Sequence, residues 1–316
     1  MRILTVATRR GELAIAQTKR VIAAVKQRHP DVEIEIKEVT SEGDRDRRTV
    51  LWNLKDTGFF TSRLEEILVA RAADFAVHSF KDLPTRQREG LTIAAVYDRR
   101  FPQDCVLARE PMDSLDRLAA GAKIGTASLR RVAQLRHLRG DVEPVPIRGN
   151  VRTRIRKLQE GDLDAIVLAR AGLERLARAD LISFTFDPHQ FIPAPAQGAL
   201  AIQARTADAA TNEILASIDD PQARAITDAE RQVLVDLKCG CHAPVGAYAE
   251  CAGDTITLDA FISTPDGAEL LRARTTGPLS DACQAGRAAA QELLQAGGRE
   301  ILDTLEKERD QGDINT

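Results

Sequence analysis

Short apolar runs alternate with stretches of helical periodicity along the first two-thirds of the chain. The apolar runs have the length of strands, and the helical stretches repeat their apolar residues every three or four positions. This alternation predicts an α/β fold built on mostly parallel sheets. The expected strands are 2–8, 31–39, 73–79, 91–97, 123–126, 142–147, 164–169 and 199–205, and the expected helices are 12–28, 59–72, 128–138, 151–159 and 171–179.

The last third of the chain has a different pattern. A helix is predicted over 221–237, strands over 245–251, 255–262 and 269–275, and a long amphipathic helix from 281 to about 307. Strands followed by a helix predict a small α+β domain with a three-stranded antiparallel sheet.

The domain boundaries follow from these patterns. The strand at 199–205 comes after the proline-rich segment 193–198 and is expected to return to the first sheet. We therefore expect a discontinuous first α/β lobe (1–98 with 197–216), a second α/β lobe (99–196) and a C-terminal α+β domain (217–316). Ligands of open α/β sheets bind beyond the carboxyl ends of the strands, so a cleft between the two lobes is the expected binding site.

The segment 125–157 holds eight arginines in a chain whose formal net charge is -3 and whose pI is about 6.0. Such a block indicates nucleic acid, phosphate or a polycarboxylate as partner, unless it forms solvated helix faces. Nucleic-acid-binding domains are generally basic overall, so the pI argues against nucleic acid. Arginine forks bind carboxylates at two points. The arginines expected to converge at one sheet edge are Arg130, Arg131, Arg148 and Arg154, and those expected to face solvent are Arg136, Arg139 and Arg156, while both positions stay open for Arg152.

Location and cysteine usage give further expectations. No apolar run approaches the roughly 20 residues that span a bilayer, and the run at 3–7 is too short for a signal peptide, so a cytoplasmic protein is expected. The five cysteines are odd in number and scattered, which argues against a disulfide framework. Cys239-Gly240-Cys241-His242 is a metal half-site, a reactive thiol or a glycine turn with structural cysteines. The other histidines are isolated, so no metal is expected.

Polar motifs follow three of the predicted strands: Arg9-Arg10-Gly11, the stretch 79–82, and the stretch 125–131. Lys81 can hold a carboxylate, and Asp82 can act as an acid, a base or a stabiliser of positive charge. A strand-end aspartate is also a common turn or cap residue, so both interpretations of Asp82 stay open. Ser128 lies at a predicted helix start, where hydroxyl and backbone N–H groups favour an anion.

Seven segments in a fixed order resemble hydroxymethylbilane synthase, the porphobilinogen deaminase family. They are ATRRGELA at 7–14, ADFAVHSFKDLP at 73–84, IGTASLRRVAQL at 124–135, IRGNVRTRIRKL at 147–158, DAIVLARAGLERL at 164–176, PAPAQGALAIQAR at 193–205 and GCHAPVGAYAE at 240–250. The resemblance implies two lobes like those of a periplasmic binding protein around a cleft, followed by a small C-terminal domain. It also implies a covalent dipyrromethane cofactor, attached by a thioether to Cys241 rather than to Cys239.

The resemblance further implies roles for individual residues. Asp82 matches the catalytic aspartate and contacts the cofactor. The other residues matching cofactor-binding positions are Ser79, Lys81, Ser128, Arg130 and Arg131, and those matching substrate-binding positions are Arg9, Arg148, Arg154 and Arg175.

The implied activity is a transferase reaction of porphyrin and haem biosynthesis, carried out by a cytoplasmic monomer. Four porphobilinogen molecules lose ammonia and join into a linear tetrapyrrole on the cofactor, and water then releases the product. Neither nucleic acid nor a membrane is an expected partner.

Two positions depart from the family pattern. Gly11 stands where serine is usual, and Thr57 stands where lysine is usual; the loop 45–56 also looks unlike the family's version. The first rival hypothesis is a diverged two-lobed binding protein for a carboxylated ligand, and the second is a nucleic-acid-binding protein. The first rival does not require Cys241 in a glycine loop, and the second predicts a basic pI that the chain lacks.

Overall fold

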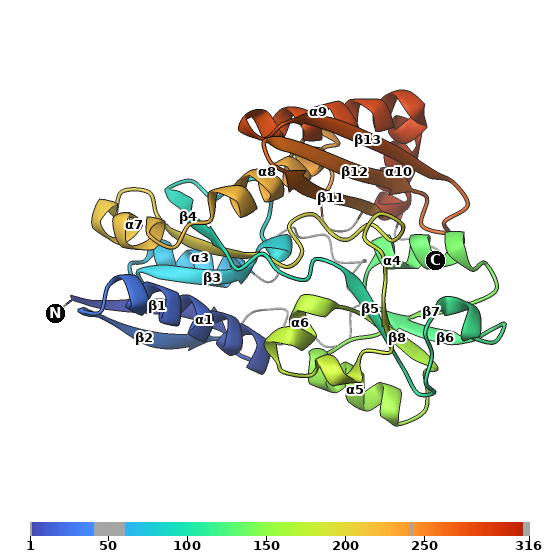
Figure 1. Cartoon of the computed structure of the whole chain (residues 1–316), viewed down its shortest axis with the longest axis horizontal. Coiled ribbons are helices and arrows are strands. Elements are labelled where there is room, and N and C mark those ends of the chain that lie inside the picture. Colours follow the sequence, from blue (N-terminus) through green and yellow to red (C-terminus); the bar gives the residue numbers. More distant parts are fainter. Residues whose placement is uncertain (1, 41–60, 241–242, 312–316) are drawn as a thin grey trace. The chain divides into compact units, whose positions relative to one another are not determined.

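The computed structural model describes residues 2–40, 61–240 and 243–311. These residues fall into two compact units (Figure 1). Unit 1 holds the described residues up to Arg100 together with Gln197–Arg224, and unit 2 holds Phe101–Ala196 and the described residues from Ala225 onwards. Within the described ranges, no helix is both long and apolar enough to cross a membrane.

The described part of unit 1 is built on a five-stranded sheet of order β2-β1-β3-β10-β4. Its strands are β1 (Arg2–Arg9), β2 (Val32–Val39), β3 (Phe75–Ser79), β4 (Leu91–Tyr97) and β10 (Leu200–Arg205). The strand expected at 199–205 does return to this sheet, as β10. It pairs antiparallel with β3 and β4, and Leu200 lies opposite both Ser79 and Tyr97. The sheet is therefore mixed, with an antiparallel strand inside it.

Helices cover both faces of this sheet. Val21 and Val25 of α1 (Glu12–Arg28) pack on Val6 of β1, as do residues of α7 (Ala209–Ala216). The neighbouring Ala7 points to the other face, where α3 (Ser62–Val69) packs, because successive strand residues alternate between faces. The predicted helix at 59–72 extended too far: Arg71 has a φ of 58°, in the left-handed region. Residues 59 and 60 lie outside the described ranges.

Unit 2 contains a second sheet, which has the order β7-β6-β8-β5-β9 in the described chain. Its strands are β5 (Asp104–Ala108), β6 (Lys123–Thr126), β7 (Glu143–Pro146), β8 (Ala165–Ala169) and β9 (Phe184–Thr185), with helices α4 (Leu129–Leu138), α5 (Val151–Gln159) and α6 (Arg170–Arg175). The strands β5 and β9 were not predicted from the sequence. The helix predicted at 171–179 ends early, because Ala177 has a φ of 53°. Since β5 runs antiparallel to β8, this sheet is also mixed.

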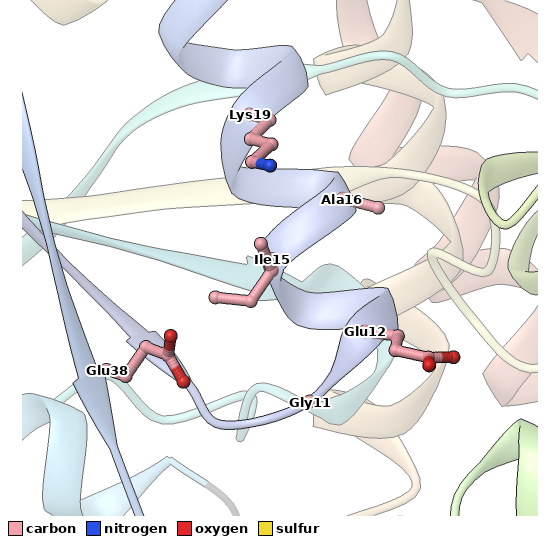
Figure 2. A pocket seen from close by; sticks show the side chains of 6 residues that line it. All are labelled: Gly11, Glu12, Ile15, Ala16, Lys19 and Glu38. Atoms are coloured by element: carbon pink, nitrogen blue, oxygen red, sulfur yellow. The ribbon is translucent and has the colours of Figure 1, made fainter.

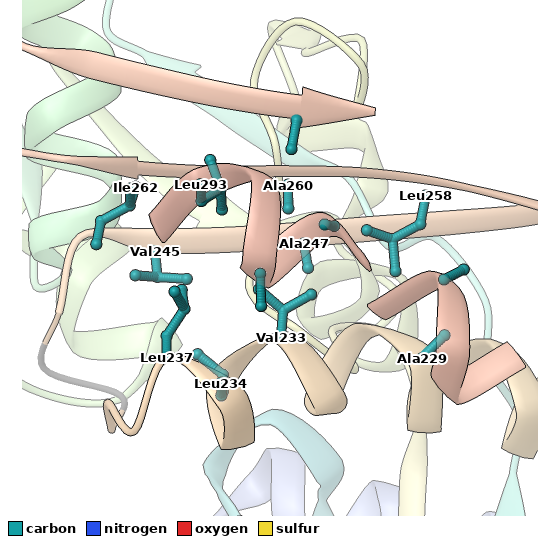
Figure 3. Packing of buried hydrophobic residues seen from close by; sticks show 14 of the residues in the cluster. Ala229, Val233, Leu234, Leu237, Val245, Ala247, Leu258, Ala260, Ile262 and Leu293 are labelled. Carbon is teal, nitrogen blue, oxygen red and sulfur yellow. The ribbon is translucent and has the colours of Figure 1, made fainter. Parts of the chain in front are cut away.

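The C-terminal part of unit 2 begins with α8 (Pro221–Asp236), whose first turn belongs to unit 1. It continues as an antiparallel sheet of β11 (Val245–Ala252), β12 (Thr255–Ser263) and β13 (Leu270–Pro278), followed by α9 (Ala282–Leu293) and α10 (Arg299–Gln311). Residues such as Val233, Ala260 and Leu293 form its buried core (Figure 3). Cys239 packs against this core, and Cys105 and Cys283 are free thiols. The predicted α/β class and the C-terminal three-stranded antiparallel sheet are confirmed.

The long helix predicted from 281 to about 307 is interrupted. A π-helical turn covers Leu294–Gly298. Gly297 within it has a φ of 114°, which residues with a Cβ rarely adopt. The glycine pair therefore divides this stretch into α9 and α10.

Candidate functional site

In unit 1, the carboxyl ends of β1 and β3 place several predicted site residues at one edge of the sheet. The two strands are parallel, so Arg9 at the end of β1 and Ser79 at the end of β3 lie at the same edge. A short 3-10 turn, Phe80–Asp82, follows β3 directly. The sheet therefore carries Arg9, Ser79, Lys81 and Asp82 to the edge where α/β proteins bind ligands.

The turn holds Asp82 between two buried anchors. Phe80 is fully buried and Leu83 is 1% exposed, whereas Asp82 is exposed. The Phe80 N–H donates to the Ala199 carbonyl at 3.0 Å, which ties the turn to the start of β10. The Leu83 N–H closes the turn on the Phe80 carbonyl at 3.2 Å. A carboxylate in this position reaches solvent from a fixed backbone.

Ser79 and Lys81 are both held by glutamine side chains. The Gln17 amide of α1 donates to Ser79 Oγ at 2.9 Å. Lys81 Nζ donates to Gln197 Oε1 at 3.0 Å, and Gln197 is 1% exposed. An amide oxygen orients an ammonium group without cancelling its charge. Neither Gln17 nor Gln197 was predicted as a site residue, although Gln197 lies inside the family-like segment 193–205.

A second sheet edge, in unit 2, lies next to several of the predicted site residues. The parallel strands β6 and β8 end at Thr126 and Ala169, and the antiparallel β5 begins there with Asp104 opposite Ala169. Ser128 precedes α4 as its N-cap residue. Arg148 follows β7, which is parallel to β6, and Arg175 ends α6; both side chains are half-buried. The strands β6, β7 and β8 thus end beside Ser128 and Arg148, and the convergence of the arginine side chains at this edge stays a prediction.

Arg130 and Arg131 share one buried carboxylate. Arg130 and Arg131 are 4% and 5% exposed, and Asp104 is fully buried. Each arginine donates from a terminal nitrogen to a different oxygen of Asp104, both at 2.7 Å. The other terminal nitrogens donate to main-chain carbonyls, of Ile192 at 2.7 Å for Arg130 and of Val167 at 3.0 Å for Arg131. Asp104 and Val106 are two positions apart on β5, so both side chains lie on the sheet face that α4 covers. The Asp104 carboxylate therefore contacts the arginines of α4.

This trio is short of negative charge. Two guanidinium groups share one carboxylate, and within the described chain neither Nε atom has a hydrogen-bond partner. Burial lowers the pKa of Arg130, and the neighbouring Asp104 carboxylate works in the opposite direction. Buried N–H groups normally donate a hydrogen bond, so the two Nε–H groups can each take a further acceptor, such as an anionic ligand. The arginines do not present open forks, because both terminal nitrogens of each already bind protein oxygens.

The segment Arg148-Gly149-Asn150 shapes the start of α5. Asn150 caps the helix by accepting from the Thr153 N–H at 2.9 Å. Gly149 has a φ of 109°, and a Cβ there would lie 2.6 Å from the Thr153 side chain. Arg154 is held back on this turn, since its Nε donates to the Gly149 carbonyl at 2.8 Å. The glycine is therefore required for the tight turn that carries Arg148.

The three arginines expected to face solvent differ in their exposure. Arg156 is 67% exposed in its side chain and pairs with Glu160 at 3.4 Å, as predicted. The prediction for Arg139 is wrong: its side chain is 18% exposed and donates to the carbonyls of Leu115 and Leu118. Helical periodicity fails there because α4 ends at Leu138. Arg136 is half-buried and Arg152 is exposed.

The position of Gly11 explains one departure from the family pattern. Gly11 precedes α1 with a φ of 140°, and a Cβ there would meet nothing within 4 Å. A serine side chain would thus have room but would strain the backbone. Gly11 also borders a solvent-open hollow along α1, which none of the predicted ligand-binding residues line (Figure 2). Thr57, the loop 45–56, Cys241 and His242 lie outside the described ranges.

His78, next to Ser79 on β3, predicts a pH dependence of stability. Burial, the largest cause, and the charge of Arg9 lower its pKa from 6.5 to about 4, while the hydrogen bond to Gln203 opposes this shift. The unfolded chain therefore takes up this proton first as pH falls. The free energy of unfolding keeps the full contribution of the neutral His78 above pH 6.5. It declines by about 3 kcal/mol in total as the pH falls from 6.5 through about 4. Urea unfolding at several pH values should show a shallower decline in His78→Gln; equal slopes in both proteins would contradict the assignment.

Comparisons with known proteins bear on both sheet edges. The family model described as "Porphobilinogen deaminase, dipyromethane cofactor binding domain" matches residues 4–213, and the porphobilinogen deaminase C-terminal domain matches residues 225–295. The porphobilinogen deaminase of Deinococcus radiodurans is 40% identical over 307 residues, covering 96% of this chain and 99% of the relative. That of Thermobifida fusca is 44% identical over 304 residues, covering 93% and 94%.

Among solved structures, the methionine binding protein MetQ aligns with a TM-score of 0.44 and 11% identity, covering 71% of this chain and 90% of that chain. The two family models between them take in both sheet edges and the C-terminal sheet. The full-length relatives carry the same family name at about 40% identity. This chain therefore belongs to the porphobilinogen deaminase family.

Proposed function

We propose that this chain is an active hydroxymethylbilane synthase. It would condense four porphobilinogen molecules, with loss of ammonia, into a linear tetrapyrrole on a covalently held dipyrromethane, and water would release the product. The observation that carries the proposal is Asp82, an exposed carboxylate on a turn whose backbone is fixed by Phe80 and Leu83. A monomer that needs no nucleic acid, membrane or metal remains a prediction.

Asp82 would stabilise positive charge. When ammonia leaves porphobilinogen, positive charge develops at the pyrrole nitrogen, and a fixed carboxylate lowers the energy of that state. A bound dipyrromethane would supply a pyrrole α-carbon as the nucleophile. Because the Asp82 turn is held on both sides, its carboxylate needs little reorganisation when the charge appears.

The basic residues would hold the acetate and propionate groups of cofactor and substrate. The two buried Nε–H groups of Arg130 and Arg131 fit this task, since they lack acceptors within the described chain. Charge-assisted hydrogen bonds of this type contribute roughly 1.5–3 kcal/mol each. The residues we assign to the cofactor are Ser79, Lys81, Asp82, Ser128, Arg130, Arg131 and, through a thioether, Cys241; those we assign to the substrate are Arg9, Arg148, Arg154 and Arg175.

The intact mass of the denatured protein tests the proposal. We expect an excess equal to two linked pyrrole units, which Cys241→Ser abolishes and Cys239→Ser, the matched control, retains. Cys239 packs against the C-terminal core, so its thiol is expected to be structural. An unmodified protein that folds and binds a carboxylated ligand would instead identify a binding protein, and the proposed activity would be abandoned.

A further inference from the structure

Four polar side chains meet on the α3 side of the unit 1 sheet. Ala76 of β3 packs with α3, and strand alternation brings His78 to the same face. Gln203 of β10 lies opposite Ala76, so its side chain is a diagonal neighbour of His78. Glu65 of α3 and Gln87 complete the group. Gln203 is fully buried, and His78 and Glu65 are 5% and 9% exposed.

The Gln203 amide connects the other three side chains. Its Oε1 lies 3.1 Å from His78 Nε2. Its Nε2 donates to Glu65 Oε1 at 3.0 Å and to Gln87 Oε1 at 3.2 Å. Both N–H groups and the carbonyl oxygen of Gln203 are therefore engaged, which fixes the amide in one orientation.

His78 has a defined role in this network. An amide oxygen only accepts, so His78 Nε2 must carry the proton. Burial and the charge of Arg9 lower the pKa of His78 to about 4, so the ring is neutral near pH 7. A neutral donor matches a neutral acceptor, and the network stays intact across the physiological range.

The network ends on the loop behind Asp82. Gln87 Nε2 donates to the Pro84 carbonyl at 3.1 Å. Pro84 follows the buried Leu83, which closes the turn on Phe80. A continuous chain of hydrogen bonds thus runs from β3, which enters the turn, through Gln203 of β10, to the segment that leaves the turn.

We propose that Gln203 and Gln87 are positioning residues for the Asp82 carboxylate, fixing the exit of its turn against the strand at its entrance. The inference rests on the proposed function, because Asp82 acquires a catalytic role only there. Neither glutamine touches the reacting atoms; each acts through the backbone of residues 80–84. Misplacing a catalytic group by about 1 Å can cost up to 100-fold in rate, so a local anchor of this kind matters.

The sharpest variant is Gln87→Glu. Its shape is nearly unchanged and it can still accept from Gln203, but it has no N–H for the Pro84 carbonyl. We expect kcat to fall about 10-fold while KM for porphobilinogen changes less than about twofold. Gln203→Leu should behave alike, with an additional loss of stability because it leaves buried polar groups unpaired.

Asn212→Ala is the matched control in unit 1. It also removes an amide that donates to a main-chain carbonyl, that of Arg205 at 2.9 Å, away from the Asp82 turn. Amide hydrogen exchange of residues 80–84, measured on the full-length protein, gives a readout independent of activity. We expect faster exchange in Gln87→Glu and Gln203→Leu, with Asn212→Ala matching wild type in both exchange and kcat.

The outcomes separate this inference from the proposed function. Unchanged exchange at 80–84 in Gln87→Glu, or faster exchange with unchanged kcat in an active enzyme, would overturn the positioning role. A fall in kcat of equal size in Asn212→Ala would reduce the effect to general destabilisation and would also overturn it. A wild-type protein without turnover and without the mass excess would overturn the proposed function, even if the exchange results still linked Gln87 to the turn.

Discussion

Asp82→Asn is expected to lower kcat by about 100- to 1,000-fold with little loss of stability, on the scale of removing one preorganised electrostatic group from an active site. Asparagine keeps the shape of the side chain but removes the charge. The side chain is exposed, and the turn is held by the backbones of Phe80 and Leu83, so folding does not depend on the carboxylate. Steady-state turnover of porphobilinogen and a thermal unfolding curve measure the two effects.

Asp31→Asn provides the control for this prediction, because Asp31 is also an exposed carboxylate of unit 1 but lies outside the candidate site. It should retain wild-type turnover. If Asp82→Asn also retained it, Asp82 would be a turn residue only, and the catalytic assignment would be withdrawn.

Asp104→Asn is expected to cause the largest loss of stability. Asp104 is fully buried and pairs with two adjacent guanidinium groups at 2.7 Å each. Removing one partner of a buried ion pair costs about 3–5 kcal/mol, because the remaining charge stays buried. With about 2–4 °C per kcal/mol for domains of this size, the melting transition of unit 2 should fall by roughly 10 °C. Differential scanning calorimetry checks this value.

Glu160→Gln is a suitable control for Asp104→Asn in the same unit. Glu160 also pairs with an arginine, Arg156, but both side chains are more than half exposed. Exposed pairs contribute about 0–1 kcal/mol, so its melting temperature should change by no more than about 4 °C. Equal melting shifts in the two variants would show that the buried trio adds nothing beyond an ordinary surface pair.

Regular elements were predictable because their signal is local. The helix Glu12–Arg28 and the strand Leu91–Tyr97 have the predicted bounds, since the helix repeats its apolar residues every three or four positions and the strand is a short apolar run. The return of the chain to the first sheet followed from the apolar stretch after the proline-rich segment. Chain reversals set by single residues were harder: Arg71 and Ala177 adopt positive φ without glycine and end their helices early.

The contacts that define the site depend on pairs far apart in the chain. Asp104 lies on a five-residue strand that carries no distinct periodicity, 26 and 27 positions before the arginines it binds. Gln203 reaches Glu65 across 138 positions. Motif matching predicted roles for Arg130, Arg131 and Asp82, but local patterns could not show that Arg130 and Arg131 both bind the carboxylate of Asp104.

The shared carboxylate of Arg130 and Arg131 has a consequence for how the protein matures. A buried basic pair short of one negative charge reaches its lowest energy only when an anion joins it. Any ligand that binds the folded chain alone shifts the folding equilibrium in favour of the folded form. If the anion is the proposed cofactor, its binding would stabilise the fold, and we expect the freshly made chain to be less resistant to heat and proteolysis than the cofactor-loaded protein.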